Sequence, residues 1–469
     1  MRPLSYLHGV LANTTFAFLS RALAVAAGII MAKKLTPDDL GNFVPDQALV
    51  LIGGGLLNLG VGQGYRLLAA RKPELQISHL LPAIAVRFCA TALYFVGLSL
   101  YLNYSGLWKL QTVLVVVGTL LLSFLELFQI DLQISRRFLS ASMLDMGRGL
   151  VVFLAALSCW VAPDGKYSYL VTCYFALSCL LVIIGWIVVR PSFVPLLRFD
   201  YLSLLKTSIP FAAALFVYSI NSYYGLIYVR GALGEGQAGC YSVPLKVYQI
   251  SLVVGMSVTG VTLPLYHKLA ASRNFVTFGA IFARLIRGMW LIGGLLVAVC
   301  FCVPEFLIRA FATEEYMAAA AVFPLIGFGI LFRLLAIPAG NILESVDKQW
   351  YRVILQAVGT VICLLAVSVV VPRWGIKGAA WTLFAVDLWT LLSYWFVSKY
   401  FAPLVVSLNK LFVPAGVMAG TIIVLSCFKS LPAWSKFLIL SSLWSAYVIF
   451  ILNFKQEITK ATGALFRRS

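Results

Sequence analysis

The stretch TTFAFLSRALAVAAGIIM, residues 14–31, is apolar along almost its whole length. An α-helix crosses the hydrocarbon core of a bilayer with about 20 mostly apolar residues, because it pairs its backbone polar groups internally. The stretch therefore predicts a membrane-spanning helix. Its one charged residue, Arg21, lies near the middle, where a charge costs about 2.5 to 3.5 kcal/mol on insertion scales. Arg21 needs either a partner or a task.

The rest of the sequence repeats this pattern. Hydrophobic residues make up 61% of the chain and charged residues 11%, whereas soluble domains are about half apolar. The apolar runs are continuous and about twice too long for transmembrane strands. We therefore predict an all-α integral membrane protein with about fourteen transmembrane helices. They lie near residues 9–32, 45–65, 79–103, 110–130, 141–161, 168–189, 207–229, 241–266, 284–303, 318–343, 353–371, 376–398, 411–428 and 436–453.

The connections between these helices are short, and the longest polar stretch is the tail after Asn453. Loops of this length cannot bury a core, so we expect no soluble catalytic domain. The nine cysteines and three histidines are scattered and lack the spacing of metal ligands. We expect neither a metal nor another cofactor, and the protein is not predicted to be an enzyme.

Basic residues predict the orientation. The net charge is +19, and with a cytoplasmic N-terminus the inner side carries about twice as many Lys and Arg as the outer side. This excess places both termini in the cytoplasm. Attraction to anionic lipid headgroups accounts for the remaining charge. No basic patch with interleaved aromatic residues lies outside the predicted helices, so we expect no binding to nucleic acid.

An internal repeat predicts two lobes. LTPDDLGNF at 35–43 and LGEGQAGCY at 233–241 each have a Leu, a Gly six positions later and an aromatic residue two positions after that. Both segments lie between two apolar runs. We predict two six-helix lobes, residues 1–200 and 201–400, related by a pseudo-two-fold repeat, with two appended helices and a short cytoplasmic tail in residues 401–469.

These segments, with YVRGALGEGQAGCYSVPLKV at 228–247, IPAGNILESVDKQWYRVI at 337–354 and VPRWGIKGAAWT at 371–382, resemble the Wzx-type flippases of polysaccharide and O-antigen units. These flippases belong to the multidrug/oligosaccharidyl-lipid/polysaccharide (MOP) exporter superfamily. The resemblance covers most of the chain up to about residue 400. It implies transport of an undecaprenyl-diphosphate-linked oligosaccharide from the inner to the outer leaflet of the bacterial inner membrane. It also implies a polysaccharide polymerase and a chain-length regulator as partners.

Two positions depart from related patterns. Asn221 stands where many relatives carry an acidic residue late in the seventh helix, which removes a coupling role from that position. Ser20-Arg21 resembles a Ser-Arg pair in the first helix of peptidoglycan-precursor flippases, but the further basic residue expected six positions later is Ala27. This difference disfavours a peptidoglycan precursor as the cargo.

Four basic residues inside the predicted helices are candidates for binding the diphosphate and sugar. Arg21 shares a helix face with the small residues Ala17, Ala24 and Gly28, so it points away from the bulky apolar side. A guanidinium can bind phosphate oxygens in a bidentate manner; the alternatives are snorkelling or an ion pair between the lobes. The other candidates are Lys246, for which snorkelling to the outer surface is the alternative, and Arg87 and Arg333, which lie nearer the cytoplasmic ends of their helices.

Aromatic and acidic residues complete the predicted site. Tyr218, Asn221 and Tyr228 share one face of the seventh helix, and aromatic rings beside an amide suit sugar hydroxyls, although Tyr is also a common interfacial anchor. Asp387 lies mid-helix in AAWTLFAVDLWTLLSYWF. It is a candidate for coupling transport to a cation gradient; alternatively it is neutral or pairs with a basic residue.

Two other functions remain open. A cation-coupled drug exporter of the same superfamily would share the architecture but would favour an acidic cavity, because its usual cargo is cationic. A membrane polymerase or ligase would need clustered charged residues in a sizeable outer loop, and the largest, around VPEFLIRAFATEEY, offers few. Fold alone does not separate these possibilities.

Overall fold

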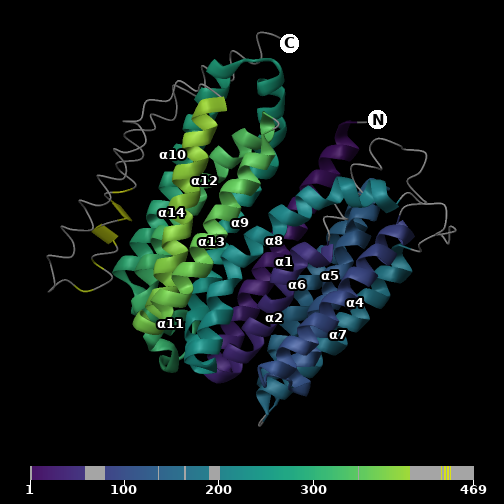
Figure 1. Ribbon diagram of the computed structural model, residues 1–469, viewed down its shortest axis with the longest axis vertical. Helices are drawn as coiled ribbons and strands as arrows, with labels where there is room; N and C mark the ends of the chain where they lie inside the picture. The colour runs from purple at the N-terminus through teal and green to yellow at the C-terminus, as the bar shows by residue number, and fades with distance from the viewer. Residues whose placement is uncertain are drawn as a thin grey trace. The chain divides into compact units, whose positions relative to one another are not determined.

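The computed structural model describes residues 3–58, 80–135, 137–162, 165–189, 201–346 and 348–401, together with a few positions between 432 and 444. Within this part of the chain every regular element is a helix (Figure 1). Nine of the described helices are long and apolar enough to cross a membrane. The prediction of an all-α, multi-pass membrane protein is confirmed.

Twelve long helices correspond to the first twelve predicted spans. The first six are α1 (Pro3–Lys34), α2 (Pro37–Asn58), α4 (Leu80–Tyr104), α5 (Leu110–Ile134), α6 (Phe138–Val161) and α7 (Lys166–Val189). The next six are α8 (Tyr201–Leu233), α9 (Glu235–Ala271), α10 (Phe275–Cys302), α12 (Phe323–Ser345), α13 (Gln349–Trp374) and α14 (Ile376–Phe401). The predicted spans at 411–428 and 436–453 lie outside the described residues, apart from a few positions in the second.

The helix ends follow local rules that the apolar pattern does not record. Gly234 separates α8 from α9 and Gly375 separates α13 from α14, each with a positive φ that favours glycine. Asn274 caps α10 by accepting a hydrogen bond from the Thr277 amide, so this helix begins nine residues before the predicted span. Between α10 and α12 the chain forms a short helix, α11 (Pro304–Phe311), and a 3-10 helix, η3 (Glu314–Val322).

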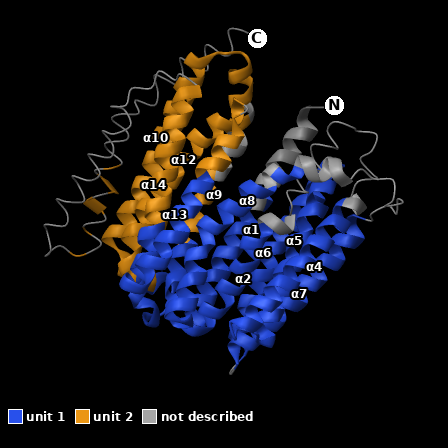
Figure 2. Cartoon of the chain, viewed as in Figure 1, with its two compact units in different colours: residues 1–246, 309–319, 356–382 blue, residues 247–308, 320–355, 383–469 orange. Residues whose placement is uncertain are grey.

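The chain divides into two compact units (Figure 2). Unit 1 contains residues 1–246, 309–319 and 356–382, and unit 2 contains residues 247–308, 320–355 and 383–469. The long helices α9, α13 and α14 each contribute to both units. The division therefore differs from the lobes predicted at 1–200 and 201–400, and the lobe assignment stays a prediction.

The glycines of the internal repeat explain why the two segments are alike. A β-carbon at Gly41 would overlap the backbone carbonyl of Glu235, and one at Gly239 would overlap that of Pro37. Each repeat glycine therefore packs against the backbone of the other segment, within unit 1. The reciprocal contact brings α2 against the junction of α8 and α9, and a larger residue at either position would force the two apart.

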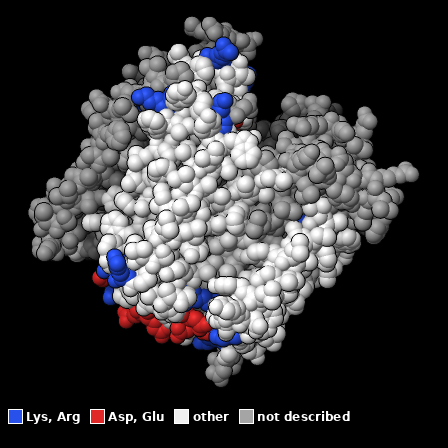
Figure 3. Space-filling model, viewed as in Figure 1, with Lys and Arg blue, Asp and Glu red and all other residues white. Residues whose placement is uncertain are grey.

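The distribution of charge fits a membrane protein. On the face shown in Figure 3, the described surface between the helix ends carries almost no Lys, Arg, Asp or Glu. Large apolar side chains point outward from several helices, for example Leu93 and Leu100 of α4, which are 76% and 67% exposed. Such exposure is stable against lipid and costly against water.

Candidate functional site

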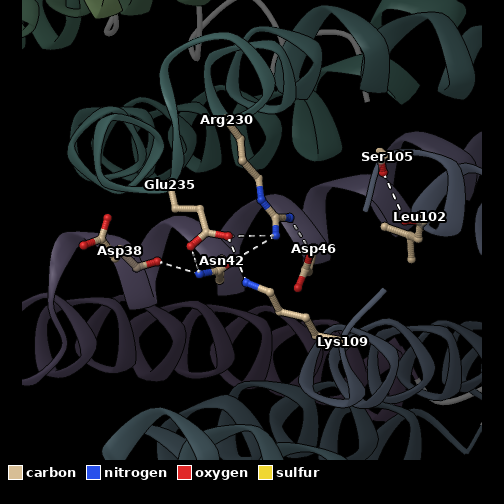
Figure 4. A network of polar contacts seen from close by, with 8 residues as sticks. All are labelled: Asp38, Asn42, Asp46, Leu102, Ser105, Lys109, Arg230 and Glu235. Carbon is tan, nitrogen blue, oxygen red and sulfur yellow. Dashed lines mark hydrogen bonds and ion pairs between the residues drawn. The ribbon is translucent and has the colours of Figure 1, made fainter. Parts of the chain in front are cut away.

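Five residues of unit 1 form a polar network where α2 meets α8 and α9 (Figure 4). We call this network the α2–α8 clamp. Its members are Asn42, Asp46, Lys109, Arg230 and Glu235. The repeat glycines position it, because they allow the backbones that carry it to touch.

The centre of the clamp is the ion pair between Arg230 and Asp46. The guanidinium lies 2.5 Å from the carboxylate, and the side chains are 3% and 0% exposed. Arg230 also donates to Asn42 Oδ1 at 2.7 Å and lies 3.9 Å from Glu235. Asn42 in turn donates to Glu235 at 2.7 Å. Arg230 thus has three partners, which offset the cost of burying its charge.

Two of the predicted substrate-binding cations have no acidic partner among the described residues. Arg21 of α1 is half-buried and makes no hydrogen bond or ion pair within this part of the chain. The Nζ atom of Lys246, on α9, is buried and likewise has no hydrogen-bond partner there. A β-carbon at Gly28 of α1 would lie 3.6 Å from this Nζ. Because Gly28 is seven residues after Arg21, the ammonium lies on the face of α1 that carries Arg21.

Arg87 and Arg148 belong to a second cluster in unit 1. Arg87 of α4 is fully buried, and its Nη1 lies 3.6 Å from Glu126 of α5. Arg148 of α6 lies 3.8 Å from Asp145, one turn earlier in the same helix. Among the described residues, the Nε and Nη2 atoms of both arginines have no hydrogen-bond partner. The sequence singled out Arg87 but not Arg148.

Arg333 and Asp387, two separate candidates from the sequence, meet in unit 2. The Arg333 Nε lies 2.8 Å from the carboxylate, and the side chains are 6% and 0% exposed. Tyr248 of α9 donates its hydroxyl to Asp387 at 2.8 Å and accepts a hydrogen bond from Arg333 at 3.2 Å. The open alternative that Asp387 pairs with a basic residue is therefore the arrangement observed.

The tyrosine face of α8 lies beside α13 in unit 1. Asn221 is buried and donates to the Gln356 carbonyl at 3.4 Å, and the Tyr228 hydroxyl donates to the Ser368 carbonyl at 3.4 Å. The backbone carbonyl of Tyr218 accepts a hydrogen bond from the Ser222 hydroxyl. These contacts leave Asn221 Oδ1 without a hydrogen-bond partner among the described residues. All three residues belong to α8, and their role toward sugar stays a prediction.

Comparison with solved structures identifies the architecture. A structure described as the lipid II flippase MurJ in an inward closed conformation matches with a TM-score of 0.74 and 12% identity, covering 94% of this chain and 99% of that one. An inward-facing multidrug-resistance MATE family transporter of the MOP superfamily matches with a TM-score of 0.66 and 13% identity, covering 83% and 97%. This chain has the fold of the MOP-superfamily transporters.

A third neighbour is described by the polarity of its binding pocket. It is a MOP-superfamily transporter from Pyrococcus furiosus Vc1, with a TM-score of 0.60 and 12% identity over 85% of this chain and 96% of that one, and its description states a reversed polarity of the binding pocket. No protein-family model and no curated protein matches the sequence. The superfamily fold implied by the sequence motifs is confirmed, and these neighbours are transporters rather than enzymes.

The α2–α8 clamp is the main feature that the sequence reasoning missed. Asp46 is an acidic residue at the start of a predicted span, and Arg230 lies 184 positions later at the end of another. Neither residue alone distinguishes a clamp from a helix-end charge. The signal that could have found it was the repeat itself, since the two repeat segments carry the partners Asn42 and Glu235.

Proposed function

We propose that this chain is a flippase for an anionic lipid-linked oligosaccharide. Its cargo is an undecaprenyl-diphosphate-linked repeat unit of a surface polysaccharide or O-antigen, moved from the inner to the outer leaflet of the bacterial inner membrane, with both termini in the cytoplasm. A polysaccharide polymerase and a chain-length regulator would then use the product. The chain acts as a transporter and performs no catalysis.

One observation carries the proposal: Arg21 and the buried Nζ of Lys246 have no acidic partner among the described residues, and both belong to unit 1. A buried charge without a counter-ion is costly. An anionic ligand would supply the missing charge. The two positions are about 10 Å apart along α1, a separation that a diphosphate and its first sugar can bridge.

The remaining predicted residues take secondary roles. Arg87 and Arg333 already have acidic partners, so each becomes available to an anion when its partner is neutralised. Protonation of Asp387 would release Arg333, which gives the gradient coupling predicted from the sequence a physical route. Tyr218, Asn221 and Tyr228 would contact the sugar.

The α2–α8 clamp supplies a gate for alternating access. On the predicted topology it lies at the outer end of α2 and α8. While it is closed, an anionic headgroup cannot pass between these helices. Release to the outer leaflet would require the Arg230–Asp46 pair to separate, so the clamp would set the population of the outward-open state.

A cation-coupled drug exporter is the second candidate, because MATE family transporters are among the neighbours of this fold. The charge of the site opposes it. Arg21 and Lys246, two cations whose acidic partners are absent from the described residues, would repel a cationic drug. A lipid-linked peptidoglycan precursor, the kind of cargo named for one neighbour, is an anion as well, and the replacement of the expected basic residue by Ala27 argues against it.

The test is the replacement of Arg21 by Ala in cells that make surface polysaccharide. We expect polysaccharide at the surface to be lost while the membrane abundance of the protein stays normal. Arg309→Ala, which removes an exposed basic residue outside the α2–α8 clamp, is the matched control for loss of a positive charge. Normal polysaccharide in the Arg21→Ala strain would remove Arg21 from the mechanism and, with it, the main support for this cargo.

A further inference from the structure

We propose that Arg21 and Arg148 form a two-arginine site for the diphosphate of the cargo, with Asp145 holding Arg148 when no cargo is bound. The inference rests on the proposed function and deepens it. It adds Arg148, a residue that neither the sequence pattern nor the fold assigns to binding. It concerns unit 1 alone.

Helices α1 and α6 pack against each other along a seam. Ser20 donates its hydroxyl to the Asp145 carbonyl at 2.7 Å, and a β-carbon at Gly149 would overlap the Ser20 carbonyl. Farther along, the Lys34 ammonium lies 4.6 Å from the ring centre of Trp160. The contacts advance in the same direction along both helices, so the two helices run parallel, and their backbones touch at Ser20 and Gly149.

The second step follows from helix geometry. One residue turns an α-helix by about 100°. Arg21 comes one residue after the contact residue of α1, and Arg148 comes one residue before the contact residue of α6. On two parallel helices that face each other, these opposite turns bring both side chains to the same side of the seam. They also lie at nearly the same height, because Ser20 and Gly149 touch.

The side of the seam that carries Arg21 and Arg148 differs from the side that faces lipid. Along α6, Leu139, Met143, Leu150 and Leu154 are 57%, 53%, 38% and 40% exposed and form one stripe that fits lipid. Arg148 and Asp145 lie on the opposite side of the helix, yet their side chains are 28% and 34% exposed. Their open surface is therefore turned away from the lipid stripe, toward the side that carries Arg21.

The fourth step is the state of the Arg148 guanidinium. Its only ion pair among the described residues is the 3.8 Å contact with Asp145, which is too long for a hydrogen bond. Its Nε and Nη2 atoms are buried and have no hydrogen-bond partner there. Asp145 is shared with Gln129 of α5, which donates to it at 3.3 Å. Arg148 is held loosely, and a phosphate oxygen would satisfy donors that Asp145 leaves open.

The charges of the surroundings match the ligand. Glu126 pairs with Arg87 and also interacts electrostatically with Arg148. Among the described residues, the basic side chains that these contacts connect to α1 and α6 are Arg21, Arg87, Arg148 and Lys246, and the acidic ones are Glu126 and Asp145. Within this set two positive charges remain unbalanced. A diphosphate esterified at both ends carries one negative charge on each phosphate and would neutralise them.

The test measures binding of three probes to the purified full-length protein in detergent: geranylgeranyl diphosphate, geranylgeranyl monophosphate and inorganic pyrophosphate. Wild-type protein should bind the diphosphate lipid more tightly than the monophosphate lipid. Arg148→Gln should weaken diphosphate binding about tenfold or more and remove this preference. Arg148→Lys keeps the charge and should retain part of the affinity. It replaces Arg148→Gln in the comparison if the glutamine variant does not fold. Arg137→Gln, at the exposed beginning of α6, should bind like wild type.

The variant Asp145→Asn distinguishes a two-arginine diphosphate site from an Arg148–Asp145 ion pair that is only structural. If Asp145 competes with the ligand for Arg148, the asparagine variant should bind the diphosphate lipid more tightly than wild type. Equal or weaker binding in this variant, or unchanged diphosphate preference in Arg148→Gln, would overturn the two-arginine site while leaving the flippase proposal intact. Absence of diphosphate-lipid binding by the wild type would refute the flippase proposal itself. Tight binding of pyrophosphate alone would identify a free anion as the ligand and overturn the lipid assignment.

Discussion

On the topology predicted from the basic residues, the α2–α8 clamp should hold the outer end of unit 1 closed, and Asp46→Asn should loosen it. Removing one partner of a buried ion pair costs about 3 to 5 kcal/mol. Arg230 would keep its bond to Asn42 at 2.7 Å and its contact with Glu235 at 3.9 Å, and asparagine retains an acceptor. We therefore expect a loss of about 2 to 3 kcal/mol from the closed state, which shifts the opening equilibrium about 30- to 150-fold.

Cys240 can report this opening. It is a native cysteine next to the repeat glycine Gly239, and it is 5% exposed. In a variant whose other cysteines are replaced by serine, a membrane-impermeant maleimide added from outside should alkylate Cys240 much faster when Asp46→Asn is present. Asp39→Asn removes an acid from the same helix without touching the ion pair and should leave the rate unchanged. An equal alkylation rate in Asp46→Asn and its parent would refute the gating role.

Four further predictions address other parts of the account. Gly41→Val should raise Cys240 alkylation as well, because its side chain would meet the Glu235 backbone; a normal rate would mean that the helices can shift to accommodate it. Asp387→Asn should weaken gradient-dependent flipping in proteoliposomes, and transport that responds to a pH or sodium gradient as in wild type would count against coupling. Lys246→Met should raise the melting temperature of the cargo-free protein, since it removes a buried charge that has no partner among the described residues; a lower melting temperature would reveal a counter-ion. A reporter fused at Ser469 should be active in the cytoplasm, and activity only outside would invert the topology.

The helices could be predicted from the sequence because their signal is local. Continuous apolar runs identified the first twelve spans, and the structure changes mainly their ends, where Asn274, Gly234 and Gly375 act through capping and turn geometry. The repeat was visible as a pattern of spacing. Its physical meaning, that Gly41 and Gly239 pack on the backbone of the opposite segment, required the packed structure.

The charge pairs could not be predicted, because pairing depends on which helices are neighbours. From the sequence, Arg21, Arg87, Lys246 and Arg333 were all candidates for the diphosphate, and only the small-residue helix face around Arg21 set one of them apart. The structure divides them: Arg87 and Arg333 have acidic partners, whereas Arg21 and Lys246 have none among the described residues. This division, rather than the number of basic residues, narrows the candidates for the diphosphate.

Arg21 and Lys246, which have no acidic partner in the described part of the chain, are proposed to bind an anionic headgroup. The most direct measurement is the affinity of purified protein for geranylgeranyl diphosphate, compared between wild type and Lys246→Met. The methionine keeps most of the side-chain volume and removes only the charge. We predict a loss of affinity of about tenfold or more; equal affinity in the two proteins would contradict the claim.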